Sequence, residues 1–229
     1  VALGLICGSL LTSFASAWGN LRMIATLTRI TFQSKPLRIS FASLIKIKVG
    51  DQYLLVAGRN FKQFQPVGGV YKFFDTDLRR RFGLVDDPLK AKNVEELRLV
   101  FPSGGIWRVF GFLKWFNSRK GRESGPHREF AEELINNGIL SAQIFADVPF
   151  EYVETVTPPI RFSTHLKVFE LQCFEIYEAI MSDAQKKAVL ALQAVSSSDY
   201  CFLTAEEIRT DGFRLGSAVP IGSHTKYII

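Results

Sequence analysis

Arg128-Glu129-Phe130-Ala131-Glu132-Glu133 is the most informative stretch of this 229-residue chain. Glu129 lies three residues before Glu132 and four before Glu133, so a helix places all three carboxylates along one surface. Phe130 and Leu134 recur at the helical spacing and are expected to face the core. Hard cations prefer such oxygen clusters, and Mg²⁺ is commonly held by one or two carboxylates with water and substrate phosphates. The alternative is a solvated acidic face with an ion pair between Arg128 and Glu132.

The sequence on both sides of this helix predicts a mixed sheet. Residues 39–49 and 53–57 read as a hairpin around the turn at Gly50-Asp51. Gly68-Gly69 lies within a further strand pattern, which is typical of a close backbone approach. The remaining patterns predict helices over 127–140 and 183–195, strands over 142–156 and 165–177, and a short helix opened by Thr204. The predicted fold class is α+β.

With Gly68-Gly69 upstream and Gly138-Ile139 downstream, the glutamate stretch resembles the Nudix box, whose pattern ends in Arg-Glu-hydrophobic-x-Glu-Glu-x-Gly-hydrophobic. Pro66 to Gly69 looks like the Pro-Gly-Gly strand end that precedes the box, and residues 202–208 look like the family's late strand and short helix. The resemblance covers residues 37–229 and implies a Nudix-like mixed sheet flanked by helices. It also implies that Glu129, Glu132 and Glu133 hold a metal, with Mg²⁺ as the expected cofactor.

The departures from the Nudix pattern are also informative. Gly69 and Arg128 are separated by 58 residues, far more than in a typical Nudix hydrolase, so we expect a long insertion at about 74–122. Glu123 lies closer to Arg128 than the family's loop glutamate does. Glu133 and Gly138 are separated by Leu-Ile-Asn-Asn rather than by one residue. The metal ligands are therefore retained, while the loop that aligns a pyrophosphate is altered.

A nucleotide bound at the box would meet residues from the glycine strand and from the start of the helix. His127 precedes Arg128 near the helix N-terminus, where backbone N–H groups and the helix dipole attract anions. A surface histidine is the alternative. The expected nucleotide-binding residues are Arg59, Gln65, Gly68, Gly69, His127 and Arg128. No Ser-His-Asp or Cys-His arrangement is legible, so no catalytic residue is assigned.

The N-terminal residues differ from the rest of the chain. Residues 1–21 carry no charge, and their length approaches the roughly 20 apolar residues that cross a bilayer. We therefore expect a transmembrane segment over residues 1–27 and a basic linker over 28–36. Arg22 and Arg29 would lie on the cytoplasmic side. A signal peptide cleaved after Ala17, or a buried core helix, are the alternatives. The chain opens with Val, so we take it as a hypothesis that another apolar helix precedes residue 1, which would make this segment the second of two.

The net charge of +6 does not indicate a nucleic-acid-binding surface. Six basic residues precede the first acid, Asp51, and the remainder of the chain is electrically balanced. A protein that tracks a phosphate backbone carries its basic groups along a groove of the folded domain. General DNA or RNA binding is therefore not expected.

A membrane segment joined by a short basic linker to an interrupted Nudix domain is similar to one group, the SMODS-associated Nudix proteins. These are two-transmembrane effectors of bacterial cyclic-oligonucleotide (CBASS) antiphage systems. The resemblance implies an inner-membrane protein with a cytoplasmic C-terminal domain. Its expected partners are a cyclic nucleotide second messenger, the inner membrane and further copies of itself. The main alternative is a Mg²⁺-dependent Nudix hydrolase of nucleoside diphosphate derivatives, and a third is an exported Nudix-fold binding protein.

Overall fold

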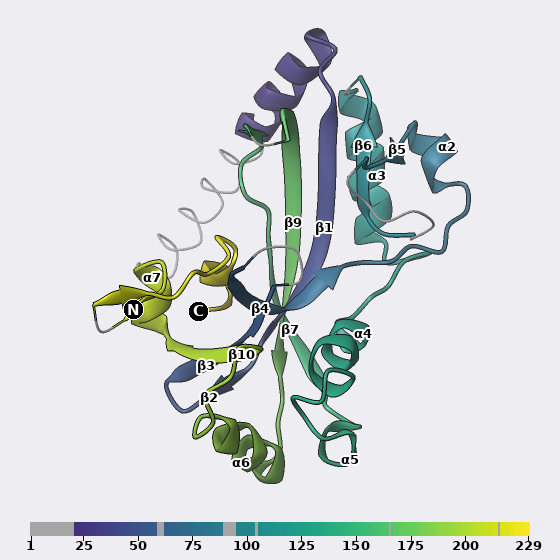
Figure 1. Ribbon diagram of the computed structural model, residues 1–229. Helices are drawn as coiled ribbons and strands as arrows, with labels where there is room; N and C mark the ends of the chain where they lie inside the picture. The colour runs from purple at the N-terminus through teal and green to yellow at the C-terminus, as the bar shows by residue number, and fades with distance from the viewer. Residues whose placement is uncertain (1–20, 59–61, 89–94, 104, 165, 215) are drawn as a thin grey trace, which may run out of the picture. The chain divides into compact units, whose positions relative to one another are not determined.

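The computed structural model describes residues 21–58, 62–88, 95–103, 105–164, 166–214 and 216–229 (Figure 1). The chain forms two compact units. The first is built from Val1–Phe41, Tyr71–Glu123 and Thr157–Cys173, and the second from Ala42–Val70, Ser124–Val156 and Phe174–Ile229. Strands β1 (Leu37–Lys46) and β9 (Val168–Ala179) contribute residues to both units. Strands and helices are both abundant, so the predicted α+β class is confirmed.

The first unit combines short strands with a helix that carries an aromatic core. The first half of β1 pairs antiparallel with β6 (Arg98–Phe101), and β8 (Arg161–Ser163) pairs with β9. Phe112 lies at the centre of the core, and its ring meets those of Phe41, Phe82 and Phe101 edge to face. The other elements of this unit are a helix over residues 21–32, α2 (Leu78–Phe82), β5 (Val85–Asp86) and α3 (Ile106–Asn117).

The two ends of the long segment between the glycine pair and the glutamate helix lie next to each other. Phe73 forms an antiparallel bridge with Arg122, and the backbone N–H of Phe74 donates to the Gly121 carbonyl at 2.7 Å. The carboxylate of Glu123 accepts a hydrogen bond from the Lys72 backbone at 2.7 Å. Residues 74–122 therefore form an excursion that is closed at its base.

The second unit is a sheet covered by short helices. Besides its parts of β1 and β9, its strands are β2 (Lys48–Val49), β3 (Gln52–Ala57), β4 (Phe64–Val70), β7 (Phe150–Val156), β10 (Tyr200–Thr204), β11 (Phe213–Arg214) and β12 (Ser217–Ala218). The main strands pair in the order β10–β3–β4–β1, all antiparallel, and β7 pairs with the second half of β9. The helical elements are α4 (His127–Phe130), η1 (Ala131–Ile135), α5 (Ala142–Phe145), α6 (Asp183–Leu192), α7 (Ala205–Arg209) and η2 (Thr225–Ile228).

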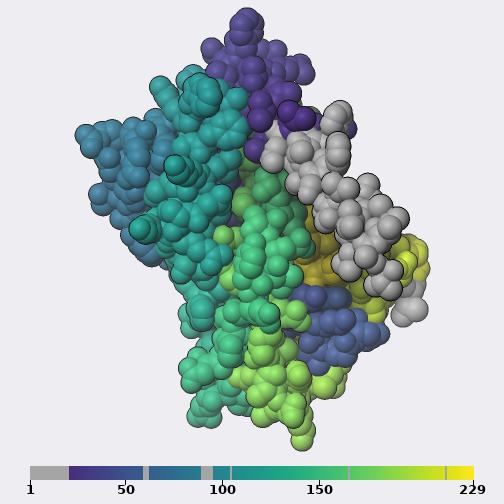
Figure 2. All heavy atoms as spheres, turned by 180° about the vertical axis from the view of Figure 1, so that it is seen from behind, coloured from purple at the N-terminus to yellow at the C-terminus, as the bar shows by residue number. Residues whose placement is uncertain are grey.

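Local sequence signals explain several of these elements. Gly50 adopts a φ of +62° in the β2–β3 turn, so the predicted hairpin is confirmed. Thr204 caps α7 in a capping box with Glu207, as its sequence predicts. Helix α6 lies beside the β2–β3 hairpin at the surface of this unit (Figure 2). Phe130 and Leu134 are buried in the hydrophobic core of the second unit, which confirms their predicted orientation.

Residues 1–20, which include most of the predicted transmembrane segment, lie outside the described residues. No helix in the part of the chain that the structure describes is long and apolar enough to cross a membrane. The end of the predicted segment and the start of the predicted linker both fall in the helix over residues 21–32.

The C-terminal residues of the second unit predict a pH dependence of stability. The His224 ring stacks on Phe174 at 5.8 Å between centroids, and burial lowers the pKa of His224 below its usual 6.5. As the pH falls below about 6.5, the unfolded chain binds a proton that the folded chain resists. The free energy of unfolding should therefore decrease as the pH is lowered from 7 to 5. His224→Phe, which keeps a ring on Phe174, should show a weaker decrease in urea unfolding. Equal pH dependence of the two proteins would contradict this assignment.

Candidate functional site

The glutamate helix of the second unit lies against strand β4. Helix α4 continues directly into η1, and the two carry Glu129 and Glu133 toward the strand. The Gly68 backbone N–H donates to Glu133 Oε2 at 2.9 Å. The Glu129 carboxylate lies beside Gly69, and both glutamates are less than one-tenth exposed. Two of the three predicted metal ligands are therefore buried under the glycine pair.

The glycine pair is required by this close approach. A Cβ at Gly69 would come within 2.6 Å of three atoms of the Glu129 carboxyl group. A Cβ at Gly68 would lie 2.2 Å from the Ser43 carbonyl oxygen on β1, and Gly68 adopts a φ of +151°. Any side chain at these positions displaces either the carboxylate or the neighbouring strand. The two motifs, far apart in sequence, are thus parts of one arrangement.

Arg128 connects the carboxylates to the strand. Its guanidinium lies 2.7 Å from Glu129 Oε1 and 3.3 Å from Glu132 Oε2, and it donates to the Val70 carbonyl at 3.0 Å. The ion pair with Glu132 is the one expected for a solvated acidic face, and Glu132 is the more exposed of the two partners. The contacts with Glu129 and Val70 go further, because they tie the helix to the end of β4.

The helix changes its winding where the second and third glutamates lie. Residues Ala131–Ile135 form a π-helical turn, and the Asn136 N–H donates to the Ala131 carbonyl at 2.8 Å. Single π-helical turns inside helices are rare and occur often at functional sites. The extra residue in the turn shifts Glu133 from the position it would have in a regular helix. In the shifted position the Glu133 carboxylate accepts the hydrogen bond from the Gly68 N–H.

These glutamates offer the chemistry that Mg²⁺ prefers, but in the structure each of them is engaged by another group of the protein. Glu129 and Glu132 are both engaged by Arg128, and Glu133 accepts a backbone hydrogen bond. Within the described residues, no group of three His, Cys, Asp or Glu side chains could hold a metal ion. The predicted Mg²⁺ site therefore stays a prediction, although Nudix domains generally use divalent cations.

The structure describes two of the other three predicted nucleotide-binding residues. Arg59 lies outside the described residues. Gln65 lies on β4 and pairs with Val56 of β3. His127 is exposed at the start of α4, with its ring 4.9 Å from that of Phe150. Of the predicted set, the structure brings Gly68, Gly69 and Arg128 to the glutamates.

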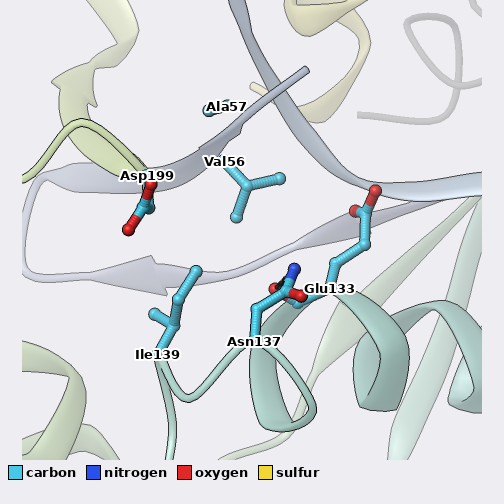
Figure 3. Close-up of a pocket in the computed structure, with 6 residues that line it drawn as sticks. All are labelled: Val56, Ala57, Glu133, Asn137, Ile139 and Asp199. Atoms are coloured by element: carbon cyan, nitrogen blue, oxygen red, sulfur yellow. Dashed lines mark hydrogen bonds between the residues drawn. The ribbon is translucent and has the colours of Figure 1, made fainter. Parts of the chain in front are cut away.

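A pocket of about 360 Å³ lies next to Glu133 (Figure 3). It is lined by Val56, Ala57, Glu133, Asn137, Ile139 and Asp199. Figure 3 shows Asn137 beside Glu133 on the helical side, with Asp199 on the opposite side of the pocket. The Asn137 side-chain amide donates to the Glu133 carbonyl at 3.1 Å, which leaves its oxygen as an acceptor. The side-chain oxygens around the pocket suit a ligand that donates hydrogen bonds.

Sequence reasoning missed a third buried acid in this unit. Glu175 on β9 is 4% exposed, and the Tyr177 hydroxyl lies 3.1 Å from its carboxylate. The same hydroxyl lies 3.0 Å from the Ser124 carbonyl, just before the glutamate helix. The signal was present, because Glu175 follows the alternation of the buried residues Cys173 and Tyr177.

The second unit offers no activated thiol at Cys201. Burial raises the pKa of Cys201 to about 12, which opposes thiolate formation at neutral pH. This cysteine therefore behaves as a small apolar residue on β10.

The contact between Glu133 and Gly68 predicts a difference between two neighbouring glutamates. Glu133→Ala leaves the Gly68 N–H without its acceptor and should lower the free energy of unfolding by about 1–3 kcal/mol. Glu132→Ala removes a more exposed ion pair and should cost about 1 kcal/mol or less. Urea unfolding of both variants tests this difference. A larger cost for Glu132→Ala than for Glu133→Ala would show that the buried contact is unimportant.

The contact between Gly69 and Glu129 predicts a specific coupling. Gly69→Ala should destabilise by about 1–3 kcal/mol, because the new Cβ overlaps the carboxylate. In a Glu129→Ala background the same substitution should cost much less, since the overlapping group is gone. Gly68→Ala is the matched control, because its clash is with the β1 backbone and should persist in that background. Additive effects of Gly69→Ala and Glu129→Ala would be inconsistent with this packing.

Comparison with known proteins agrees with this geometry. No curated protein sequence matches the chain. The SMODS-associated NUDIX domain matches residues 36–229 and so covers both described units except for the N-terminal helix. The match includes the glycine pair, the insertion and the glutamate helix, and it gives the domain a defence-associated context. The chain therefore belongs to the SMODS-associated NUDIX domain family.

Proposed function

We propose that this protein is a membrane-anchored CBASS antiphage effector. Its Nudix-like domain binds a cyclic nucleotide second messenger in the cytoplasm, and binding triggers disruption of the bacterial inner membrane. The observation that carries this proposal is the family match over residues 36–229, together with a ligand-sized pocket next to Glu133. The uncharged residues 1–21 support the membrane location.

The structure of the glutamate helix favours binding over hydrolysis as the main task of the site. Arg128 engages Glu129 and Glu132, and Glu133 accepts from Gly68. Hydrolysis through a metal would require these carboxylates to exchange such contacts for a cation. A sensor needs no such exchange, because the same contacts hold the pocket wall in place.

The pocket supports an assignment of which part of the messenger enters it. Glu133 and Asp199 line it, and no basic side chain lines it among the described residues. Carboxylates repel a phosphate, whereas the Asp199 carboxylate and the Asn137 amide oxygen accept hydrogen bonds from amino groups of a base. Val56 and Ile139 supply apolar surface. A nucleobase is therefore the group proposed for this pocket, and the phosphates remain outside it.

Signalling requires the messenger to bind one state of the protein more tightly than another. Copies of the chain that assemble in the membrane provide such a state, and a ligand with higher affinity for the assembly shifts the population toward it. The size of the shift is set by the ratio of the two affinities. Turnover of the messenger is not required and would end the signal.

The full chain in lipid nanodiscs tests this function with cyclic di- and trinucleotides and linear dinucleotides, with and without Mg²⁺. Calorimetry should detect tight binding of one cyclic species, and chromatography should detect no product. Asp199→Ala should weaken that binding by about tenfold or more, because hydrogen bonds to charged groups contribute about 1.5–3 kcal/mol. Asp183→Ala, at the start of α6 and outside the pocket, is the matched control. Mg²⁺-dependent cleavage without cyclic-nucleotide binding would instead identify a Nudix hydrolase.

A further inference from the structure

The helix over residues 21–32 in the first unit, purple in Figure 1, has two apolar faces. Leu27 and Ile30 form the inner face and are each 1% exposed. Leu21, Ile24 and Phe32 are 58%, 40% and 91% exposed. Together with Thr28 these three residues are spaced by three, four and four positions, which places them on one stripe of the helix. This outer stripe, defined as Leu21, Ile24, Thr28 and Phe32, is apolar surface that the unit does not cover.

Trp107 lies at the start of α3, which contacts the last turn of the helix over residues 21–32. The Gly105 backbone N–H donates to Thr31 Oγ1 at 3.1 Å, which joins the start of α3 to the last turn of the helix. Trp107 follows two residues after Gly105 and is 83% exposed. Two large aromatic side chains, Phe32 and Trp107, therefore project from neighbouring backbone. Tryptophan is enriched where proteins meet the headgroup region of a bilayer.

The polar side chain of the outer stripe, Thr28, is compatible with a poorly hydrated environment. Its hydroxyl donates to the Ile24 carbonyl at 2.9 Å. The hydroxyl is thus satisfied within the helix, which lowers the cost of removing it from water. Arg22 and Arg29 are exposed one position after Leu21 and Thr28, so they flank the stripe along one side.

We propose that the outer stripe and Trp107 rest in the headgroup region of an anionic lipid bilayer. The helix then lies along the membrane surface over about 18 Å, with Phe32 and Trp107 as anchors. Arg22 and Arg29 meet the anionic headgroups, and no acid occurs in the first fifty residues to oppose them. In the sequence, the uncharged residues 1–20 immediately precede this helix, and they are the residues proposed to anchor the protein in the same membrane. The inference rests on the proposed membrane location.

A second copy of the chain is a poorer occupant of the outer stripe. A symmetric contact through this stripe would bring Arg22 and Arg29 of each copy toward the same residues of the other. Like charges across an interface cost energy, whereas anionic headgroups attract them. Charge therefore favours lipid over self-association at this face.

The test measures the tryptophan fluorescence of the full chain reconstituted in lipid vesicles, without any nucleotide. The acyl chains of the lipids carry bromine, which quenches a tryptophan that lies in the bilayer. The chain has Trp18, Trp107 and Trp115, so the emission of Trp107 is taken as the difference between the wild type and Trp107→Phe. That difference should fall by about twofold or more in brominated vesicles that contain phosphatidylglycerol. The corresponding difference for Trp115→Phe is the matched control, since Trp115 is buried and should be unaffected.

The basic side chains provide a second comparison. Raising the phosphatidylglycerol content should increase quenching of Trp107 in the wild type but not in Arg22→Gln/Arg29→Gln. A Trp107 that is not quenched in vesicles that carry the chain overturns the proposal, as does equal quenching in neutral and anionic vesicles. A chain that does not float with vesicles also overturns it. Quenching without any nucleotide-triggered leakage supports this inference and contradicts the proposed effector function, so the two are distinguishable.

Discussion

Glu129 fills the space left by the absent side chain of Gly69, and Glu133 accepts a hydrogen bond from the Gly68 N–H. These two contacts position the helix on which both glutamates lie. Burying a carboxylate is costly unless it is paired or hydrogen-bonded. Arg128 and the Gly68 N–H supply those partners, and Arg128 also bonds the end of β4. The apolar face of the same helix, with Phe130 and Leu134, completes the attachment by packing into the core. Arg128, Glu129 and Glu133 therefore hold the helix against β4, and Glu133 also lines the pocket.

The insertion is accommodated because it is closed where it begins. The bridge between Phe73 and Arg122, and the bond from the Lys72 backbone to Glu123, bring its two ends together. Loop closure becomes only slowly more costly as a loop lengthens. This loop also contributes Phe82, Phe101 and Phe112 to an aromatic core with Phe41 of β1. A long excursion can thus be inserted without separating the glycine strand from the glutamate helix. The glycine pair and the glutamate helix are far apart in sequence, but they are in contact in the folded chain.

Local signals predicted the parts that depend on local chemistry. The turn at Gly50, the cap at Thr204 and the inward orientation of Phe130 follow from backbone preference and helical spacing, and the structure confirms them. Residues 142–156 were predicted as strand, but residues 142–145 form helix α5 and the strand begins at Phe150. Phe145 explains the error, because a buried aromatic residue produces the same short apolar pattern in either state. Alternation along β9 places Glu175 on the face of Tyr177, but the contact that continues from the Tyr177 hydroxyl to Ser124 joins a segment distant in sequence, so Glu175 was missed.

From its order of residues alone the chain specifies an α+β domain, a glycine pair, a helix rich in carboxylates and an uncharged N-terminal segment. These features rest on spacing and composition, which act within a few residues of each other. The roles of the glutamates were fixed by folding: two became buried beneath β4 and one stayed near the surface with Arg128. The pocket beside Asn137 and the exposed stripe that ends at Phe32 arose in the same way. Burial, partner choice and cavity shape depend on segments that are distant in sequence, and only packing brings those segments together.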